Sequence, residues 1–212
     1  YYRFAKDVVV PEQDFDTPEL LTLVSEMTDE AVARVGQGGA SATEISGDLE
    51  ALYGYPSVNS DVATRVAQMA VQRAVNEQLA RQSEWPDVTD CDRLEQAFRE
   101  LNERGVITLA GNICCSNCAH SELTEEVEAA DSAVGYAFFH AQDLGNVKPG
   151  YDSHLWVGYG APGDDPSQIA EVGRIVSDAL ERNGLSVEWS GDPDDRVGVY
   201  LCWQRRWLEL PV

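Results

Sequence analysis

Apolar residues recur at every third or fourth position along the first third of the chain, which is the spacing of one face of an α-helix. The first such face consists of Leu20, Val24, Met27, Ala31 and Val35. Thr17 is placed to cap this helix, Pro18 fits its first turn, and Gly36 follows as its stop. The pattern therefore predicts an amphipathic helix that buries one face.

Two more helices are predicted before the pattern changes. Ser41 and Glu44 have the spacing of a capping box, which begins a shorter helix that ends at Gly54. A third helix is expected from about residue 61 to about residue 81, where one apolar stripe contains Val62, Val66, Met69 and Ala70. Such a stripe is more often part of a core than a partner surface.

The helical pattern is interrupted in the segment 82–90, which carries Pro86 and several polar residues. We place a domain boundary there. The sequence then predicts a helical N-terminal region over residues 1–90 and a second domain over residues 91–212.

The second domain mixes helical and strand patterns. One helix ends at Gly105, one spans about 121–130, and one begins at Pro166. Strand-like runs lie at 106–109, 135–141, 154–159, 185–189 and 196–203. The order α-β-α-β-β-α-β-β, with its hairpin connections, favours a mainly antiparallel sheet with helices on one face. The predicted fold class is therefore α+β.

The chain has a formal net charge of -22, spread over its whole length. Such a field repels nucleic acid and anionic membranes, so we expect neither as a partner, whereas a basic or neutral protein partner fits. No run approaches the roughly 18 apolar residues of a membrane span, and residues 1–6 lack the features of a signal peptide. Five cysteines, an odd number, indicate free thiols or metal ligands in a reducing compartment. We therefore expect a cytoplasmic protein.

Three of the cysteines crowd into the segment 114–118. Cys115 and Cys118 have the C-x-x-C spacing with which a tight turn brings two thiolates to one zinc ion. Cys114 or His120 would add a third ligand. A closed structural site needs four ligands, and the candidates for the fourth are His140, His154, Cys91 and Cys202.

The same cysteines fit two other interpretations. A strand that leads into C-x-x-C and then into a helix start lowers the pKa of the first thiol, which is typical of redox sites. Cys114, directly before the pair, is an unhelpful extra thiol in that case. Small, reduced, buried side chains on a turn are the third interpretation. The sequence leaves the metal, redox and buried-turn hypotheses open.

A second group of candidates follows the aromatic run 136–139. By strand alternation His140 and Gln142 share one face, with Asp143 on the other face unless the strand has ended. A histidine at a strand end can act as a general base or a metal ligand, and Asp143 would orient it. A capped polar group is the more ordinary interpretation.

Two further motifs have structural interpretations. The segment 158–163 matches G-x-G-x-x-G, but the following helix begins only at Pro166, behind two aspartates that repel phosphate. We therefore reject a dinucleotide site. The segment 203–207 places two arginines beside two tryptophans, which favours internal cation–π contacts or pairing with the acidic surface.

Several spaced motifs resemble a bacterial family known only as a domain of unknown function. They include Cys-Cys-Ser-Asn-Cys at 114–118 and Gly-Tyr-Ala-Phe-Phe-His-Ala-Gln-Asp at 135–143, and the likeness covers roughly residues 94–206. The first 90 residues lie outside it. The resemblance implies a shared fold but no activity, and it nominates for testing Cys114, Cys115, Cys118, His140, Gln142 and Asp143.

No complete constellation for nucleophilic, phosphoryl or hydride chemistry can be assembled from the sequence. We therefore expect a non-enzymatic regulatory or partner-binding protein, in which the cysteine cluster is a structural or metal-bearing turn. The alternative is an enzyme in which a thiolate of the cluster, assisted by His140, is a redox or nucleophilic centre.

Overall fold

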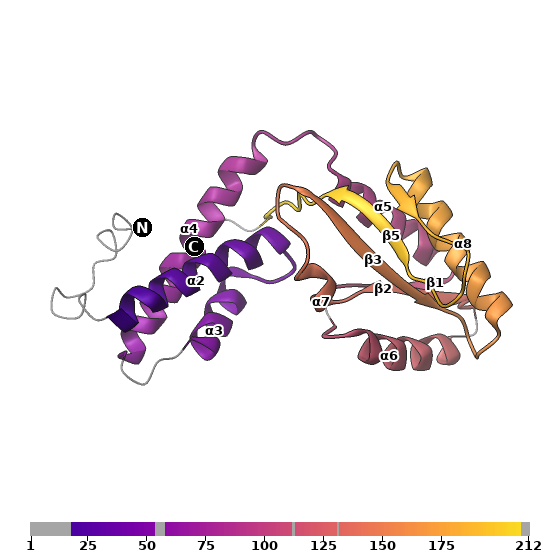
Figure 1. The fold of residues 1–212 in the computed structure, drawn as a ribbon, viewed down its shortest axis with the longest axis horizontal. Coiled ribbons are helices and arrows are strands. Elements are labelled where there is room, and N and C mark those ends of the chain that lie inside the picture. The colour runs from indigo at the N-terminus through magenta and orange to yellow at the C-terminus, as the bar shows by residue number, and fades with distance from the viewer. Residues whose placement is uncertain (1–17, 54–57, 112, 131, 209–212) are drawn as a thin grey trace. The chain divides into compact units, whose positions relative to one another are not determined.

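The computed structural model describes residues 18–53, 58–111, 113–130 and 132–208. The described chain divides into two compact units, a helical unit that runs from Pro18 to Trp85 and includes residues 205–208, and a second unit over Pro86–Gln204 (Figure 1). None of the helices in the described ranges is both long and apolar enough to cross a membrane. Residues 1–6, Thr17 and Gly54, which figured in the predictions, lie outside the described residues.

The helical unit contains α2 (Pro18–Gln37), α3 (Ala42–Leu52) and α4 (Ser60–Gln82). Their apolar faces meet in one core, as the spacing of the apolar residues predicts. The capping box is confirmed, because the Ser41 hydroxyl accepts the Glu44 N–H and the Glu44 carboxylate accepts the Ser41 N–H.

The C-terminal segment, residues 205–208, belongs to the helical unit, whereas the prediction put it in the domain 91–212. The side-chain amide of Gln78 donates to the Arg205 carbonyl, and Gln82 exchanges two hydrogen bonds with the backbone of Trp207. The Trp207 ring is buried in the helical core. Side-chain amides of α4 fix this segment, and the hydrophobic pattern carries no sign of such contacts.

The second unit has the predicted α+β organisation. Its elements are α5 (Asp90–Glu103), β1 (Val106–Ala110), α6 (Ser116–Ala129), β2 (Gly135–Phe139), α7 (Ala141–Leu144), β3 (Asp152–Gly160), α8 (Pro166–Arg182), β4 (Ser186–Glu188) and β5 (Val197–Cys202). The predicted order is confirmed except for α7. This helix has four residues, which is too short to produce a helical period in the sequence.

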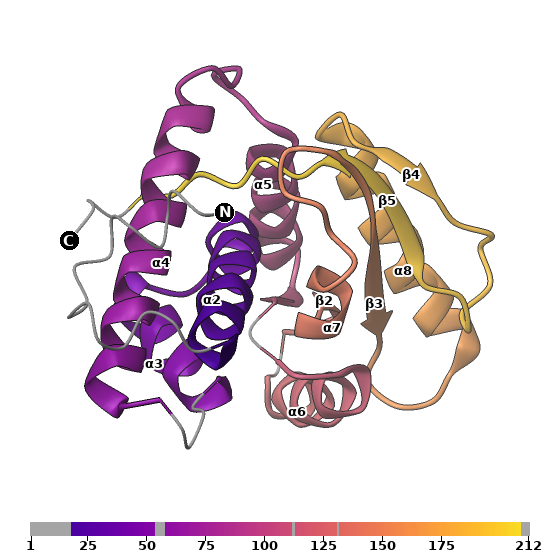
Figure 2. The same cartoon turned by 60° about the vertical axis from the view of Figure 1, so that its left-hand side comes forward.

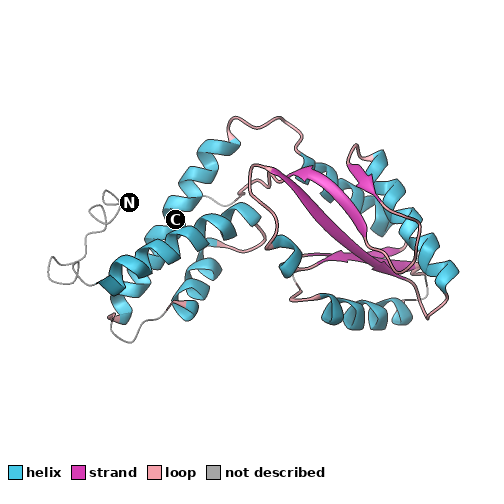
Figure 3. Cartoon of the chain, viewed as in Figure 1, coloured by secondary structure: helices cyan, strands magenta, loops and turns pink. Residues whose placement is uncertain are grey.

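The described strands, drawn in magenta in Figure 3, form one sheet. Their order is β1-β2-β3-β5-β4. The β1–β2 pair is parallel and the other three pairs are antiparallel, so the sheet is mainly antiparallel as predicted. Parallel neighbours need a crossover, and α6 supplies it between β1 and β2. The chain segments that follow β1 and β2 therefore leave the sheet at the same edge.

Helices cover both faces of this sheet, whereas the prediction placed them on one face (Figure 2). Buried residues of α5 and α8 share a large core with Phe139, Leu155 and Val199. On the opposite face, α6 packs on Tyr136 and Phe138. This second layer extends over β1 and β2, which carry the packed residues.

The G-x-G-x-x-G segment is part of this packing. Gly158 and Gly160 lie within β3 opposite Phe138 and Tyr136. A Cβ at Gly158 would lie 2.6 Å from the Phe138 ring, and a Cβ at Gly160 would overlap Tyr136. These glycines therefore make room for aromatic rings, and the following helix begins only at Pro166.

Candidate metal centre

The cysteine cluster lies where the chain leaves β1 and enters α6. Cys115 is the N-cap of α6 and Cys118 lies in its first turn. The helix predicted over residues 121–130 thus begins at Ser116, five residues earlier, so that the C-x-x-C motif spans its N-terminus. One helical turn places the first and fourth residues of such a motif on the same side.

Two backbone hydrogen bonds fix the loop before the cysteines. The N–H of Gly111 donates to the Phe139 carbonyl at 2.9 Å, and the N–H of Ala141 donates to the Ile113 carbonyl at 2.8 Å. Gly111 has φ of 80°, a left-handed conformation that glycine adopts without strain. The loop that carries Cys114 is therefore tied to the end of β2 and the start of α7.

The three thiols form a compact triangle. The Sγ atoms of Cys114 and Cys118 are 3.4 Å apart, those of Cys115 and Cys118 are 3.6 Å apart, and those of Cys114 and Cys115 are 3.7 Å apart. A tetrahedral zinc ion with Zn–S bonds of about 2.3 Å holds its sulfur ligands about 3.8 Å from one another. The triangle therefore has nearly the size of one face of a zinc–thiolate tetrahedron.

All three thiols are free, and Cys114 and Cys118 are exposed while Cys115 is half-buried. This arrangement contradicts the hypothesis that the cluster consists of buried side chains on a turn. Among the described residues, the ligand atoms gathered here within 4.8 Å of one another come from these three cysteines.

The structure brings none of the other predicted ligands into this group of atoms. His120 points to the sheet, where its Nδ1 lies 2.8 Å from the Tyr136 hydroxyl and its ring packs edge-on against Phe138. Burial lowers the pKa of His120, and the positive charge of Arg196 adds to this effect. Cys91 is buried in the core of the second unit.

The pKa values of Cys115 and Cys118 are shifted in opposite directions. Backbone N–H groups of the first turn of α6, led by that of Cys118, and the neighbouring thiols lower the pKa of Cys115. Hydrogen bonding with Cys114 and Cys115, and the negative charge that they carry as thiolates, raise the pKa of Cys118 to about 11. One thiolate is thus favoured, while further deprotonation is opposed by repulsion that a bound cation would relieve.

The run His140, Gln142 and Asp143 has a different arrangement. The strand ends at Phe139, and His140 caps α7, with its Nδ1 accepting the Asp143 N–H at 3.2 Å. Asp143 is buried, and the Arg196 guanidinium donates to both of its carboxylate oxygens at 2.9 and 2.8 Å. Gln142 is exposed. His140 and Asp143 therefore form a buried cap and ion pair.

Arg196 is the residue of this network that sequence reasoning missed. It lies 53 positions after Asp143, and its Nη2 also donates to the Trp156 carbonyl at 2.7 Å. No local pattern joins residues so far apart. The sequence offers only a weak signal for Arg196: it is a single arginine that follows three aspartates at the start of an apolar strand.

Comparison with known proteins gives a family for this chain. A family model described as a domain of unknown function (DUF6891) matches residues 22–207, a range that includes the three cysteines and the run His140–Asp143. The match begins in α2, so the family includes the helical unit, which the resemblance seen in the sequence left out. Searches of curated proteins and of solved structures found no match.

Proposed function

Because the chain belongs to the DUF6891 family, whose function is unknown, we propose a function from the site itself: the second unit binds one zinc ion through the thiolates of Cys114, Cys115 and Cys118. The observation that carries this proposal is the triangle of sulfur atoms, 3.4 to 3.7 Å apart, which needs only a slight expansion to match the face of a zinc–thiolate tetrahedron.

The donor set narrows the choice of metal. Thiolates are soft ligands that prefer zinc, copper(I) and iron–sulfur clusters, whereas magnesium and calcium prefer oxygen. Sulfurs this close together suit a single ion better than a cluster. Zinc needs no change of oxidation state and takes a tetrahedral arrangement. Zinc is therefore the metal that fits the triangle best.

Three protein ligands leave the fourth position of a tetrahedral ion for water or for an outside group. Structural zinc sites use four protein ligands, and sites with three are those that bind an exchangeable ligand. The exposure of Cys114 and Cys118 gives such a group access to the ion. A histidine or cysteine of a partner protein would complete the coordination.

This role requires no catalysis by the chain. His140 is engaged in the cap of α7 and Asp143 in its ion pair with Arg196, so neither supports a general-base role at the cysteines. The free thiols of the chain fit the reducing cytoplasm. We therefore infer a non-enzymatic, partner-binding protein of the cytoplasm with zinc at its exposed thiols.

Metal analysis tests the proposal. Protein purified without chelator is expected to contain about one equivalent of zinc by mass spectrometry, with the thiols of Cys114, Cys115 and Cys118 protected from a thiol reagent until a chelator is added. Serine at Cys114, Cys115 or Cys118 should abolish this protection. Cys202→Ser is the matched control, since Cys202 lies outside the triangle, and should keep the zinc.

Cobalt(II) gives an independent readout, because its thiolate complexes absorb strongly in the near ultraviolet. The wild type and Cys202→Ser should show this band, and the three cluster variants should lose it. Equal metal content in the wild type and all variants, with the wild-type thiols of Cys114, Cys115 and Cys118 reacting freely, would refute the zinc site.

A second candidate function is thiol–disulfide exchange at the same motif. The observation in its favour is the position of Cys115 at the N-terminus of α6 with Cys118 one turn away, at an Sγ–Sγ distance of 3.6 Å. The Cys115 thiolate would attack a disulfide of the substrate, form a mixed disulfide and release one substrate sulfur as a thiolate. Cys118 would then give its proton to this thiolate, attack Cys115 Sγ to form the Cys115–Cys118 disulfide and release the second substrate sulfur as a thiolate.

The two candidates differ in the role of Cys114. Exchange needs only Cys115 and Cys118, so Cys114→Ser would still reduce a model disulfide at the rate of the wild type. Zinc binding needs all three thiols. The redox function would be favoured if Cys114→Ser kept the wild-type rate of disulfide reduction and if neither this variant nor the wild type contained bound metal.

A further inference from the structure

One half of the sheet face that carries α6 is open to solvent and lined with aromatic rings. Phe138 and Gly158 share this face, since a Cβ at Gly158 would touch the Phe138 ring. Strand alternation then places Trp156 and His154 of β3 on the same face. Tyr200 of β5 lies opposite His154 in the register. We call His154, Trp156 and Tyr200 the aromatic strip.

The rings of the strip hold one another in place. His154 and Tyr200 are stacked, with ring centroids 4.4 Å apart and an interplanar angle of 9°, and His154 also contacts Trp156 at 4.4 Å. Gly198 pairs with Trp156, and a Cβ there would lie 2.5 Å from His154 Nε2. The missing side chain at Gly198 lets His154 lie against the sheet. The strip is thus a preformed aromatic surface.

Two of these rings remain accessible. Trp156 is 40% exposed and Tyr200 is 49% exposed, both large fractions for aromatic residues within strands of a sheet. Single exposed apolar residues need no explanation, but neighbouring stacked rings mark interaction surfaces more often. The strip therefore offers ring faces to a ligand.

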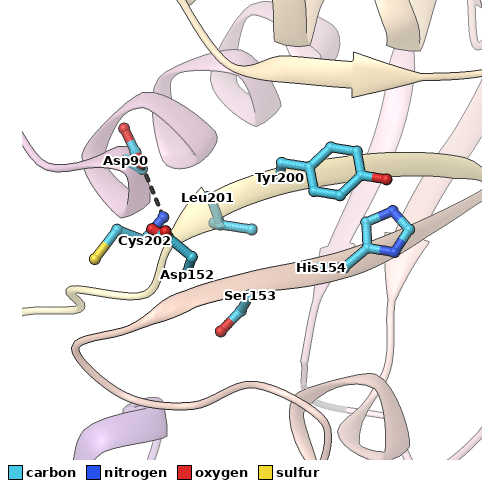
Figure 4. Close-up of a pocket in the computed structure, with 7 residues that line it drawn as sticks. All are labelled: Asp90, Asp152, Ser153, His154, Tyr200, Leu201 and Cys202. Carbon is cyan, nitrogen blue, oxygen red and sulfur yellow. Dashed lines mark hydrogen bonds between the residues drawn. The ribbon is translucent and has the colours of Figure 1, made fainter.

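Carboxylates flank the strip at both ends. At one end the Tyr200 hydroxyl donates to Glu188 Oε2 at 2.6 Å. At the other end Asp152 and Asp90 line a hollow together with His154 and Tyr200 (Figure 4). The Asp90 carboxylate also accepts the Cys202 N–H at 2.9 Å, which joins α5 to β5 beside the hollow.

The charge around the strip selects the sign of a ligand. Residues 86–204 include 22 acidic and 7 basic residues. The faces of aromatic rings attract cations, and this attraction strengthens where carboxylates stand nearby. Nucleic-acid bases can stack on such rings, but their phosphates would be repelled by this field. A second copy of the chain carries the same net charge of -22 and is disfavoured for the same reason.

We propose that the aromatic strip binds an arginine-bearing segment of a basic partner protein, with a guanidinium group stacked on Tyr200 and Trp156 and its N–H groups facing Glu188 or Asp152. Arginine fits better than lysine, since its planar guanidinium stacks on rings and forms paired hydrogen bonds with carboxylates. This surface uses none of the three cysteines of the triangle, so the proposal is independent of the zinc site.

Peptide binding tests the proposal. The probe is a fluorescent peptide of alternating glycine and arginine, measured by anisotropy with the full chain at low and at physiological salt. The same peptide with lysine replacing arginine should bind more weakly at equal charge. Tyr200→Ala, which changes no charge, should weaken binding of the arginine peptide by about 5- to 30-fold.

Matched variants separate this site from general attraction by the acidic surface. Tyr151→Ala removes a tyrosine that is 70% exposed and outside the strip, and it should leave binding unchanged. Tyr200→Phe keeps the ring and should keep most of the affinity, which guards against a folding defect. Glu188→Gln should weaken binding more than Glu181→Gln, whose charge lies on α8.

Two results of the peptide assay would overturn the proposal. One is that the wild type and each variant bind the arginine peptide no more tightly than the lysine peptide, which would mean that net charge alone attracts the peptides. The other is an equal effect of Tyr151→Ala and Tyr200→Ala. Binding of a single-stranded oligonucleotide that Tyr200→Ala abolishes would instead assign the strip to nucleic acid.

Discussion

Asp143→Asn is expected to destabilise the second unit, because it removes a buried charge from its partner. The Asp143 side chain is 7% exposed, and both of its oxygens accept hydrogen bonds from Arg196. Its Oδ2 also accepts the His140 N–H at 2.9 Å. Asparagine keeps the size of the side chain but places an NH₂ donor against the donors of the guanidinium.

The magnitude follows from the burial of the two partners. Removing one member of a fully buried ion pair costs about 3–5 kcal/mol, since the other charge is left without compensation. Arg196 is 31% exposed, so water can hydrate part of its remaining charge. The expected loss in the free energy of unfolding is therefore about 2–4 kcal/mol.

Urea denaturation followed by tryptophan fluorescence measures this loss. Trp156, Trp189 and Trp203 lie in the second unit, so the signal reports chiefly on the part of the chain that contains Asp143. Glu171→Gln is the matched control, because the pair of Glu171 with Arg174 is exposed and such pairs contribute little. The reasoning would be refuted if Asp143→Asn destabilised the protein no more than this control.

Three further predictions concern the thiols and the glycines. In metal-free protein at neutral pH, iodoacetamide should alkylate Cys115 faster than Cys118, as mass spectrometry of peptides would show; equal rates would contradict the pKa difference. The folded state raises the pKa of Cys118 from 9.0 to about 11, so it holds this proton more tightly than the unfolded chain does. The resulting contribution to stability is full below about pH 9 and is lost towards pH 11, and Cys118→Ser should reduce that loss in urea titrations across this range. Gly173→Ala should destabilise the second unit by about 1–3 kcal/mol, because its Cβ would lie 2.6 Å from the Tyr159 and Trp189 rings. Gly47→Ala, in another helix and with no atom within 4 Å of its Cβ, should stabilise the protein by about 0.5–1 kcal/mol. Midpoints of thermal unfolding that shifted in the same direction for both variants would contradict this prediction.

Much of the fold follows from local patterns. The helices and strands were predicted from apolar periods and from glycine and proline positions, and these patterns reflect local geometry and burial. The C-terminal segment was misplaced because amides of Gln78 and Gln82 hold its backbone from positions more than 120 residues away. Contacts of this kind leave no trace in a period of two or 3.6 residues.

The candidate metal site was predictable only in part, for a similar reason. C-x-x-C spacing predicts that Cys115 and Cys118 converge, because one helical turn brings them together. Nothing in the spacing requires Cys114 to join them, since neighbouring side chains normally diverge. Its position depends on the chain that precedes it, where hydrogen bonds from the end of β2 and from α7 hold Gly111 and Ile113 in place.

The cysteine cluster and the run His140–Asp143 thus have different roles in one region of the second unit. Asp143 and His140 fix α7, the Ala141 N–H of α7 holds Ile113, and Ile113 directly precedes Cys114. The polar run that suggested a general base therefore supports the loop that carries the thiols. Preformed ligand positions bind a metal more tightly than mobile ones, because less conformational entropy is lost on binding. The buried cap of α7 holds the loop before Cys114, and Cys114 and Cys118 are exposed to an outside ligand. This is the arrangement expected of the proposed metal centre.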